Sequence, residues 1–338
     1  MKRIMAGLLA GLCLLSLTAC GGESSCESTF FAMDTVMSFA VYGEGAQAAV
    51  TACQQEINAL EDTLSRTRDT SEISLLNREK AASLTGETLS LLRRAEELSA
   101  LTGGLFDVTV APLVDLWAIT SEHPRVPEPA EIETCLTACV GPAHLHLTED
   151  GARLDAGCSI DLGGIAKGYA AHRVRDILEE HGVQSAAVSL GGNAYVRGTR
   201  PDGKLWSVGI QDPADLEKCC AYLALSDRFV VTSGGYQRYF TDDSGRVYHH
   251  ILDPRTGYPA DSGLTSVTVI GQDGTAADAL STALFIMGAE GAAAFWRAHP
   301  ELQLDLLLIT ADGRILCTLP ADTVTIPEGS TYVFEALA

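Results

Sequence analysis

The segment AAVSLGGN, residues 186–193, opens the part of the chain that decides the fold. Apolar runs of strand length follow it with short polar connections: LWSVGI (205–210), AYLALSD (221–227), FVVTSGG (229–235), VYHHILD (247–253), LTSVTVIG (264–271), LQLDLLLI (302–309) and RILCTLP (314–320). Beyond residue 142 only two helical patterns interrupt the strands, one after Gly164 and one at residues 275–288. A doubly wound parallel sheet needs a helix between consecutive strands. We therefore expect an α+β fold with a largely antiparallel sheet and flanking helices.

The first third of the chain adds a strand and two helices. Alternation in DTVMSFAVYG (34–43) is typical of a strand with one buried face. Apolar residues then recur at helical spacing from Val50 to Leu64, and a second helix fits GETLSLLRRAEELSALTGG (86–104), which ends at a glycine pair. Residues 121–142 are rich in proline and charge, so we expect a surface excursion or a small helix there.

The first twenty residues predict export, because Lys2 and Arg3 precede an apolar run that is too short for a membrane span. The run ends in LTAC (17–20), which resembles the lipobox of bacterial lipoproteins and predicts a signal peptide over residues 1–19 and lipidation of Cys20. An ordinary cleaved signal with an incidental cysteine is the alternative. Residues 20–28 then form a lipidated tether on the extracytoplasmic side of a membrane in the bacterial cell envelope. The folded body covers residues 29–338, in two intimately packed halves.

Composition limits the partners and the chemistry. Without Lys2 and Arg3, 21 basic residues (23 − 2) face 44 acidic ones, a net charge of −23. This charge argues against nucleic acid or an anionic lipid surface as a partner, so any phosphate site must be built locally from cations, backbone dipoles or a metal ion. The ten cysteines show neither a CxxC pair nor a zinc spacing. Cys135 with Cys139, or Cys219 with Cys220, can oxidise outside the cytoplasm, but we expect buried thiols.

The stretch DLGGIAKGYAAHRV (161–174) brings paired glycines and a lysine to the start of a predicted helix. A Walker loop needs its lysine directly after a glycine and before a hydroxyl residue, but Lys167 follows Ala166 and precedes Gly168. The glycines do not fit the Rossmann GxGxxG pattern either. What remains is a helix whose free N-terminal amides, with Lys167 in the first turn, favour an anion. Alternatively, the glycines only let the helix pack closely on a strand.

A second helix, TAADALSTALFIMG (275–288), carries an apolar stripe with Asp278 and Thr282 together on the opposite face. A carboxylate and a hydroxyl one turn apart can supply two oxygen ligands to Mg²⁺. A solvated helix face with an acid near its N-terminus is the alternative.

The segment YHHILDPRTGYP (248–259) combines a strand with a tight turn that is unusually rich in His, Asp and Arg. His249 and His250 point to opposite sides of the strand, so only one can face a cleft and serve as a general base. The glycine-rich strand ends SLGGN (189–193) and TSGGYQRYF (232–240) would let a ligand approach the backbone closely, or form bulges.

The order of these motifs along the chain is more specific than any one of them. From about residue 31 to residue 310 the chain resembles the FAD:protein FMN transferase family, also called the ApbE family of flavin-trafficking lipoproteins. The motifs that carry the resemblance are AMDTVMSF (32–39), SEISLLN (71–77), GGLFDVTVAPLVDLW (103–117), IDLGGIAKGYAA (160–171), SLGGN, TSGGYQRYF, HHILDPRTGYP (249–259) and ADALSTALFIMG (277–288).

The resemblance implies a T-fold-like α+β architecture with a flavin nucleotide in a cleft between two halves. It also implies a Mg²⁺-dependent reaction in which FAD, as substrate, is cleaved at its pyrophosphate. FMN is then joined through a phosphoester to a threonine of an acceptor redox protein, and AMP leaves. Two alternatives are an FAD pyrophosphatase that uses the same metal site and a flavin-binding lipoprotein without catalysis.

Site residues follow from the same resemblance. Asp278, Thr282 and the backbone carbonyl of Gly164 would ligate Mg²⁺, and His250 would activate the acceptor hydroxyl. The FAD site would be lined by Met33, Leu105, Phe106, Asp107, Asp161, Lys167 and Leu252. Thr67 occupies a position near the flavin or adenine at which some members carry a tyrosine, and a threonine cannot stack.

Overall fold

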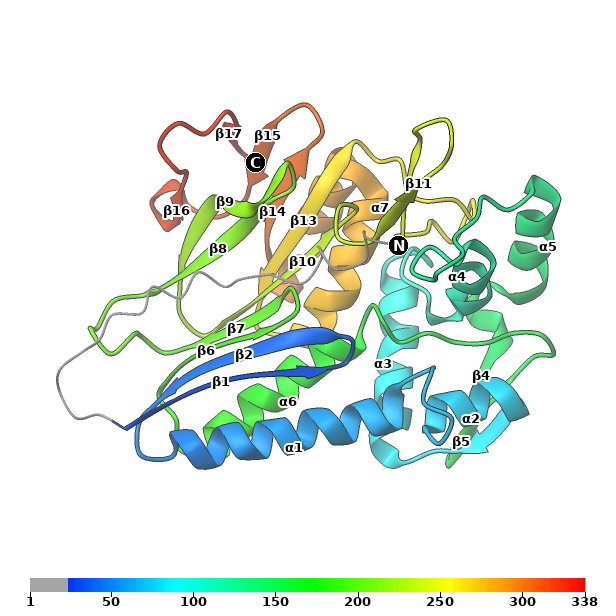
Figure 1. Ribbon diagram of the computed structural model, residues 1–338, viewed down its shortest axis with the longest axis horizontal. Helices are drawn as coiled ribbons and strands as arrows, with labels where there is room; N and C mark the ends of the chain where they lie inside the picture. Colours follow the sequence, from blue (N-terminus) through cyan, green and yellow to red (C-terminus); the bar gives the residue numbers. More distant parts are fainter. Residues whose placement is uncertain (1–23, 338) are drawn as a thin grey trace.

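A nine-stranded sheet forms the centre of the protein, whose computed structural model describes residues 24–337 (Figure 1). The strand order is β1-β2-β6-β7-β10-β13-β14-β15-β17, and neighbours are antiparallel except β15 and β17. This confirms the expected α+β fold with a largely antiparallel sheet. The strands are β1 (Ser25–Ala32), β2 (Thr35–Tyr42), β6 (Ser185–Leu190), β7 (Asn193–Arg197), β10 (Arg228–Gly234), β13 (Leu264–Gly271), β14 (Asp305–Thr310), β15 (Arg314–Cys317) and β17 (Val333–Ala336).

Seven α-helices lie in the described part of the chain, and three small sheets accompany them. The helices are α1 (Ala46–Leu64), α2 (Glu72–Glu79), α3 (Gly86–Leu101), α4 (Ala111–Trp117), α5 (Pro129–Cys139), α6 (Ala166–Glu180) and α7 (Gly274–Ala298). The small sheets are β3 (Ala81–Ser83) with β5 (Gly151–Leu154) and β4 (Leu145–Leu147), β8 (Trp206–Asp212) with β9 (Asp215–Leu225) and β16 (Val324–Thr325), and β11 (Tyr239–Thr241) with β12 (Val247–His249).

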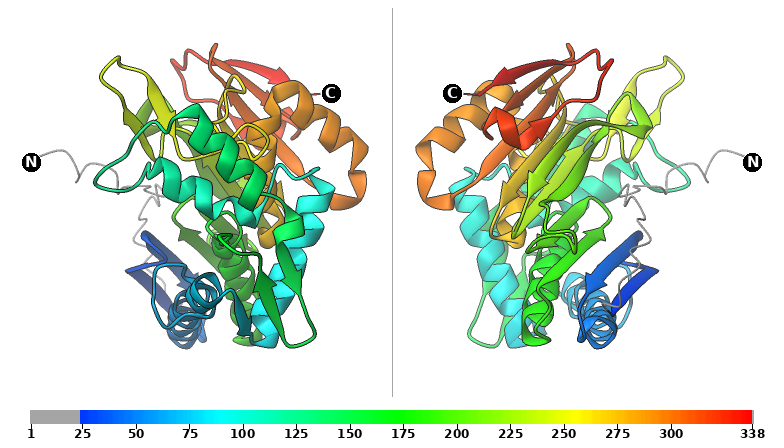
Figure 2. Two further views of the ribbon diagram at one scale, coloured as in Figure 1. Left: turned by 90° about the vertical axis from the view of Figure 1, so that its right-hand side faces the viewer. Right: turned by 90° about the vertical axis from the view of Figure 1, so that its left-hand side faces the viewer.

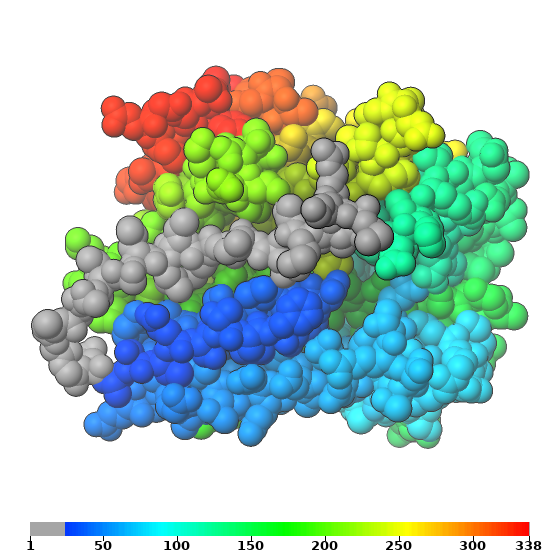
Figure 3. Space-filling model, in the orientation of Figure 1, coloured from blue at the N-terminus to red at the C-terminus, as the bar shows by residue number. Residues whose placement is uncertain are grey.

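The two faces of the large sheet are covered differently, and strand β10 shows how. Phe229 and Val231 belong to the main core under α1, α6 and α7, whereas Val230, between them, packs toward β8 and β9. Strand residues alternate between the faces, so each apolar residue of β10 is buried on one side or the other. Helices α6 and α7 lie on one side of the large sheet, and strands β8 and β9 lie on the other (Figure 2). The β1–β2 hairpin and α1 lie side by side at the surface (Figure 3).

The N-terminal boundary differs from the expectation. Strand β1 begins at Ser25 and pairs with β2 along its whole length, so residues 25–28 belong to the sheet and not to the tether. The apolar face of β1, which includes the buried Cys26, explains the pairing. The predicted signal peptide, residues 1–19, and the lipidation site Cys20 lie outside the described residues.

Helix α7 is longer than its sequence pattern suggests. It continues beyond Gly288, where the backbone leaves helical geometry (φ 75°, ψ 176°), so the predicted end is a kink. By length and composition α7 could span a membrane, but 61% of its most apolar window is buried in the fold. Apolar composition on all sides therefore reflects a core helix. Helices α2 and α4 were not expected; α5 confirms the small helix expected within residues 121–142.

Candidate functional site

The site is organised where the start of α6 meets the start of α7. A Cβ atom on Gly168 would lie 2.2 Å from the carbonyl oxygen of Gly274 and 2.5 Å from Cβ of Asp278. Only glycine permits this backbone contact. The contact lets the N–H of Gly168 donate a 2.7 Å hydrogen bond to Oδ2 of Asp278. The close packing is between two helices at Gly168, whereas the alternative interpretation of the glycine pair expected the helix to pack closely on a strand.

Asp278 and Thr282 lie together, as their one-turn spacing predicts, and Gly164 joins them. Asp278 is only 5% exposed. Burial raises the pKa of its carboxyl group, while the charge of Lys167 and the Gly168 N–H act in the opposite direction. A Cβ on Gly164 would lie 3.7 Å from Oγ1 of Thr282 and 3.4 Å from the Phe106 ring. Gly164 therefore lies close to Thr282, which is one helical turn from Asp278, and the Phe106 ring packs beside Gly164.

The oxygen atoms of Asp278, Thr282 and Gly164 are of the kind that binds a hard cation. Water or a bound phosphate would have to supply the rest of its coordination shell. No group of three His, Cys, Asp or Glu side chains within residues 24–337 is able to hold a metal ion by itself. The amide of Asn193, from SLGGN, is 2% exposed, and its Nδ2 has no hydrogen-bond partner although it lies close enough to lower the pKa of Asp278. A buried carboxylate, a hydroxyl and a nearby carbonyl are the donors that Mg²⁺ prefers, with the remaining positions left to water or phosphate.

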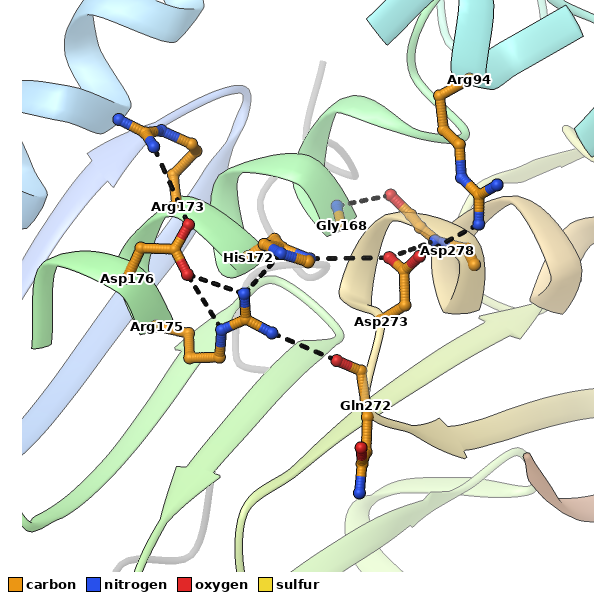
Figure 4. A network of polar contacts seen from close by, with 10 residues as sticks. Arg94, Gly168, His172, Arg173, Arg175, Asp176, Gln272, Asp273 and Asp278 are labelled. Atoms are coloured by element: carbon orange, nitrogen blue, oxygen red, sulfur yellow. Dashed lines mark hydrogen bonds and ion pairs between the residues drawn. The ribbon is translucent and has the colours of Figure 1, made fainter. Parts of the chain in front are cut away.

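A network of charges fixes the N-terminus of α7 (Figure 4). Asp273 caps the helix by accepting a 3.0 Å hydrogen bond from the N–H of Ala276, and it pairs with Arg94 at 3.1 Å and with His172 at 3.5 Å. Although burial acts to raise it, the nearby His172 ring, the Ala276 N–H and Arg94 hold the pKa of Asp273 well below its usual range. Because Arg94 lies on α3 and His172 on α6, the network holds three helices around the site.

The two histidines have different environments. Nε2 of His249 bonds the carbonyl of Ala260 at 2.9 Å, Nδ1 accepts from the N–H of Ile251 at 3.3 Å, and the ring packs edge-on against Phe285. Nδ1 of His250 instead lies 3.2 Å from the carbonyl of Arg238, so it must carry the proton there and Nε2 keeps a lone pair. Burial, then the charge of Arg238, lowers the pKa of His250 to about 4. His250 is thus neutral at pH 7 and suited to accept a proton.

Lys167 connects these groups electrostatically. Its Nζ lies 3.3 Å from the carbonyl of Gly163, on the loop that carries Gly164. Burial raises the pKa of Asp278 and lowers that of His250, and the positive charge of Lys167 acts to lower both. Lys167 is therefore close enough to act electrostatically on both Asp278 and His250, and it lies on the segment that also carries Gly164.

The described part of the chain matches a known family over most of its length. A family model described as the ApbE family matches residues 33–306. This chain belongs to the ApbE family. It is 35% identical over 285 residues to the FAD:protein FMN transferase of Klebsiella pneumoniae (strain 342), covering 82% of this chain and 87% of the relative. It is 33% identical over 337 residues to the FAD:protein FMN transferase of Treponema pallidum (strain Nichols), covering 90% and 91%.

Solved structures agree with the family assignment. The ApbE protein of Thermotoga maritima superposes with a TM-score of 0.79 at 35% identity, covering 86% of this chain and 96% of that one. The flavin transferase ApbE of Vibrio cholerae gives a TM-score of 0.76 at 28% identity, covering 86% and 94%. The resemblance and the fold expected from the sequence are thereby confirmed, and the relatives' names agree with the expectation of a transferase enzyme.

In this ApbE-family chain, Asp161 is held by an arginine that the sequence reading missed. Arg66 pairs with Asp161 at 3.1 Å and with Asp115 at 2.5 Å, and Asp161 also accepts a 2.7 Å hydrogen bond from the N–H of Gly163. Thr67 follows on the exposed surface, where its hydroxyl lies 3.1 Å from that of Ser65. Asp161 is therefore bonded to the loop that contains Gly163 and Gly164, and its negative charge is paired with Arg66. The ion pairs span long sequence distances, so no local pattern could have revealed Arg66.

The three residues Leu105, Phe106 and Asp107 have different structural roles. Leu105 and Phe106 are buried in the main core, and Phe106 reaches Gly164. Asp107 accepts hydrogen bonds from the backbone N–H (2.8 Å) and hydroxyl (2.7 Å) of Thr109, and burial raises its pKa. Its carboxylate thus caps its own turn, so a role toward FAD stays a prediction.

Met33 and Leu252 lie in separate parts of the structure. Met33, half-buried with φ 47°, sits in the β1–β2 turn, where the next residue, Asp34, pairs with Arg238 at 3.0 Å. Leu252 is buried in a small cluster with Trp117, whose Nε1 donates a 2.7 Å hydrogen bond to the carbonyl of Gly257. The structure thus links Met33 to the segment that holds His250, and anchors Leu252 and the DPRTG turn (253–257) on α4.

The cysteines within residues 24–337 are free thiols, and no disulfide joins them. Burial raises the pKa of Cys53 and of Cys220 to about 12, so these thiols stay protonated and unreactive at neutral pH. Burial of Cys139 and Cys220 agrees with the expectation of buried thiols, whereas Cys135 and Cys219 are half-buried.

Proposed function

We propose that this chain is a Mg²⁺-dependent FAD:protein FMN transferase, which moves FMN from FAD to a threonine of an extracytoplasmic acceptor protein and releases AMP. The observation that carries the proposal is the close approach of the Gly164–Gly168 segment to Asp278 and Thr282, and Lys167 in that segment acts electrostatically on both Asp278 and His250. The transferase names of relatives at 33–35% identity support the same reaction.

The metal and phosphate groups would be held by different residues. The carboxylate of Asp278, the hydroxyl of Thr282 and the carbonyl of Gly164 would hold Mg²⁺, with the remaining positions left to FAD phosphate oxygens and water. Bound Mg²⁺ would neutralise charge on the pyrophosphate and make AMP a better leaving group. Lys167 adds a positive charge near the same phosphates, and the N-terminal amides of α6 favour an anion there.

His250 would act on the acceptor. Its Nε2 accepts the proton of the threonine hydroxyl while the threonine oxygen forms a bond to the FMN phosphorus and the bond to the AMP oxygen breaks. The hydrogen bond from Nδ1 to Arg238 holds the ring in the tautomer that this step needs. A general base typically contributes a factor of about 10² to 10⁴ in rate, so charge stabilisation at the phosphates should be the larger effect.

The setting of the reaction rests on residues 1–20, which lie outside the described part of the chain. Lipidation of Cys20 would place the enzyme at the membrane, where exported or membrane-embedded redox proteins would be its acceptors. Labelling cells with a radioactive fatty acid tests this, since wild-type protein should incorporate label and Cys20→Ala protein should not. Label on both proteins would rule out Cys20 as the anchor.

One assay distinguishes the possible activities. Residues 21–338 are incubated with FAD, Mg²⁺ and a flavin-acceptor domain with its target threonine, and both AMP and covalent flavin are measured. AMP together with flavinylated threonine supports transfer, whereas AMP without it indicates an FAD pyrophosphatase. Absence of AMP with FAD bound indicates a carrier and contradicts the proposal.

Two substitutions test the assigned roles. Asp278→Ala should abolish AMP release, because it removes the only carboxylate among the proposed ligands; Asp312→Ala, at a distant surface ion pair with Arg314, is the control. His250→Ala should impair transfer to threonine more than FAD binding. If FAD binding falls by the same factor as transfer, the histidine is structural.

A further inference from the structure

The hydroxyl group of Thr282 has a partner on the central sheet. Oγ of Ser233, near the end of β10, lies 3.4 Å from Oγ1 of Thr282 and 2.7 Å from Oγ of Ser281. Ser281 in turn donates a 2.8 Å hydrogen bond to the backbone carbonyl of Asp278. Three hydroxyl groups and one carbonyl thus form a chain beside the proposed metal ligands.

The number of protons on the three hydroxyl groups determines which of them donates in each contact. Each hydroxyl has a single proton, and that of Ser281 is used on the carbonyl of Asp278. The 2.7 Å contact between Ser233 and Ser281 must then use the proton of Ser233. The oxygen of Ser233 is left as an acceptor, so the contact with Thr282 must use the proton of Thr282. The lone pairs of Thr282 are consequently free for another partner.

The position of Ser233 follows from the alternation of β10. Phe229 and Val231 face the helices, so the next residue on that face, Ser233, also points toward α7. Thr232 lies on the opposite face, where its hydroxyl pairs with that of Thr268 at 2.8 Å. On the face of β10 that packs on the helices, Ser233 thus follows the apolar residues Phe229 and Val231. It lies where the strand reaches Thr282, a proposed metal ligand.

We propose that Ser233 is a positioning residue for the metal site: by accepting the proton of Thr282, it aims the lone pairs of that hydroxyl at the divalent cation. The inference rests on the proposed function, because it assumes that Thr282 is a ligand. Partners of this kind orient the ligands of metal sites, and their loss typically weakens metal binding about 10- to 100-fold. A merely structural serine would affect stability but not metal affinity.

The test measures metal binding directly. Mg²⁺ is titrated calorimetrically into residues 21–338 saturated with FAD, without an acceptor, and Mn²⁺ binding is followed by electron paramagnetic resonance. Ser233→Ala should weaken the affinity for both ions about 10-fold or more, while FAD binding without metal stays unchanged. Ser233→Thr, which keeps the hydroxyl, should restore most of the affinity. Thr232→Val, which removes the neighbouring hydroxyl on the other face, should leave it unchanged.

The outcomes separate this inference from the proposed function. Wild-type metal affinity in Ser233→Ala, or an equal loss in Thr232→Val, overturns the role of Ser233. If Asp278→Ala still binds Mg²⁺ as well as the wild type does, the metal site itself is wrong. Should Ser233→Ala fail to fold, Ser233→Cys replaces it, because a thiol is a weaker acceptor of similar shape and should give an intermediate affinity. Unchanged affinity in a folded Ser233→Cys protein would also count against the inference.

Discussion

The backbone N–H of Gly168 donates a 2.7 Å hydrogen bond to Oδ2 of Asp278, although the two residues are 110 positions apart in the chain. The bond exists because Gly168 and Gly274 bring the backbones of α6 and α7 into contact. A backbone amide in the first turn of α6 therefore binds the carboxylate of Asp278, the proposed metal ligand. The stretch DLGGIAKGYAAHRV (161–174), which resembles a phosphate loop in composition, thus forms one side of the contact between α6 and α7. We call this contact the α6–α7 joint.

Replacing Gly168 by alanine should disrupt this joint. The new Cβ would lie 2.2 Å from the Gly274 carbonyl, so α6 and α7 must separate. We expect a loss of about 1–3 kcal/mol in the free energy of unfolding, which is typical of overpacking. We also expect the rate of AMP release to fall, because the position of Asp278 depends on the same contact. Denaturant unfolding and the FAD assay measure the two effects. Gly86→Ala, at the start of α3 with no atom within 4 Å of its Cβ, is the control; equal behaviour of the two variants would contradict the joint.

The pH dependence of the reaction should reflect the environment of His250. Its pKa is lowered from 6.5 to about 4, mainly by burial, so the neutral form persists to low pH in the folded protein. The value of kcat/KM should therefore stay level from about pH 6 to 8 and fall only near pH 4–5. The free energy of unfolding should also decrease as the pH falls, because the unfolded chain binds a proton at His250 near pH 6.5 and the folded protein does so only near pH 4. The contribution of neutral His250 to stability is therefore complete above pH 6.5 and is lost as the pH falls toward 4.

A control for this profile is the neighbouring histidine. His249→Gln should alter stability, since His249 bonds Ala260 and packs on Phe285, but should leave the acid limb in place. His250→Gln should remove the limb together with most of the transfer. An acid limb centred near pH 6.5 in the wild type would show that the base is not His250 in this environment.

How far the sequence predicts the site depends on whether a partner is local. Asp278 and Thr282 are one helical turn apart, so their shared face was predictable from periodicity. The N–H of Gly168, the guanidinium of Arg66 and the hydroxyl of Ser233 reach their partners through tertiary packing, and no local pattern reveals them.

The same distinction applies to the fold. The antiparallel sheet followed from consecutive apolar runs, whereas β1 was missed because its burial depends on pairing with β2. The kink at Gly288 was mistaken for a helix end, since a glycine ends many helices but interrupts this one. Helix α4 is stabilised by contacts to α5 and by the hydrogen bond from Trp117 to the carbonyl of Gly257, which is 140 positions further along the chain.

Removing Arg66 should weaken FAD binding without unfolding the protein. Arg66 holds Asp161 and Asp115, but both ion pairs are partly exposed, so Arg66→Met should change the free energy of unfolding by no more than about 1 kcal/mol. Release of Asp161 beside the Gly163–Gly164 loop should raise the KM for FAD more than it lowers kcat. Arg68→Met removes a neighbouring arginine that pairs with Glu61 on the surface and should leave KM unchanged. A KM effect of the same size in both variants would argue for a general charge effect.

Trp117 should control the FAD site through the DPRTG turn. Its buried indole donates a 2.7 Å hydrogen bond to the carbonyl of Gly257 and packs on Tyr248, directly before the two histidines. Trp117→Phe leaves that carbonyl unpaired and a small cavity, which should cost about 2–3 kcal/mol in the free energy of unfolding. The matched control is Trp296→Phe, which loses a 2.8 Å indole hydrogen bond to the carbonyl of Leu304 at the far end of α7. Both variants should lose stability in denaturant unfolding, but only Trp117→Phe should raise the KM for FAD, because only its turn adjoins Leu252 and His250. If Trp296→Phe raises KM equally, the change in FAD binding follows from lower stability and not from the position of the turn.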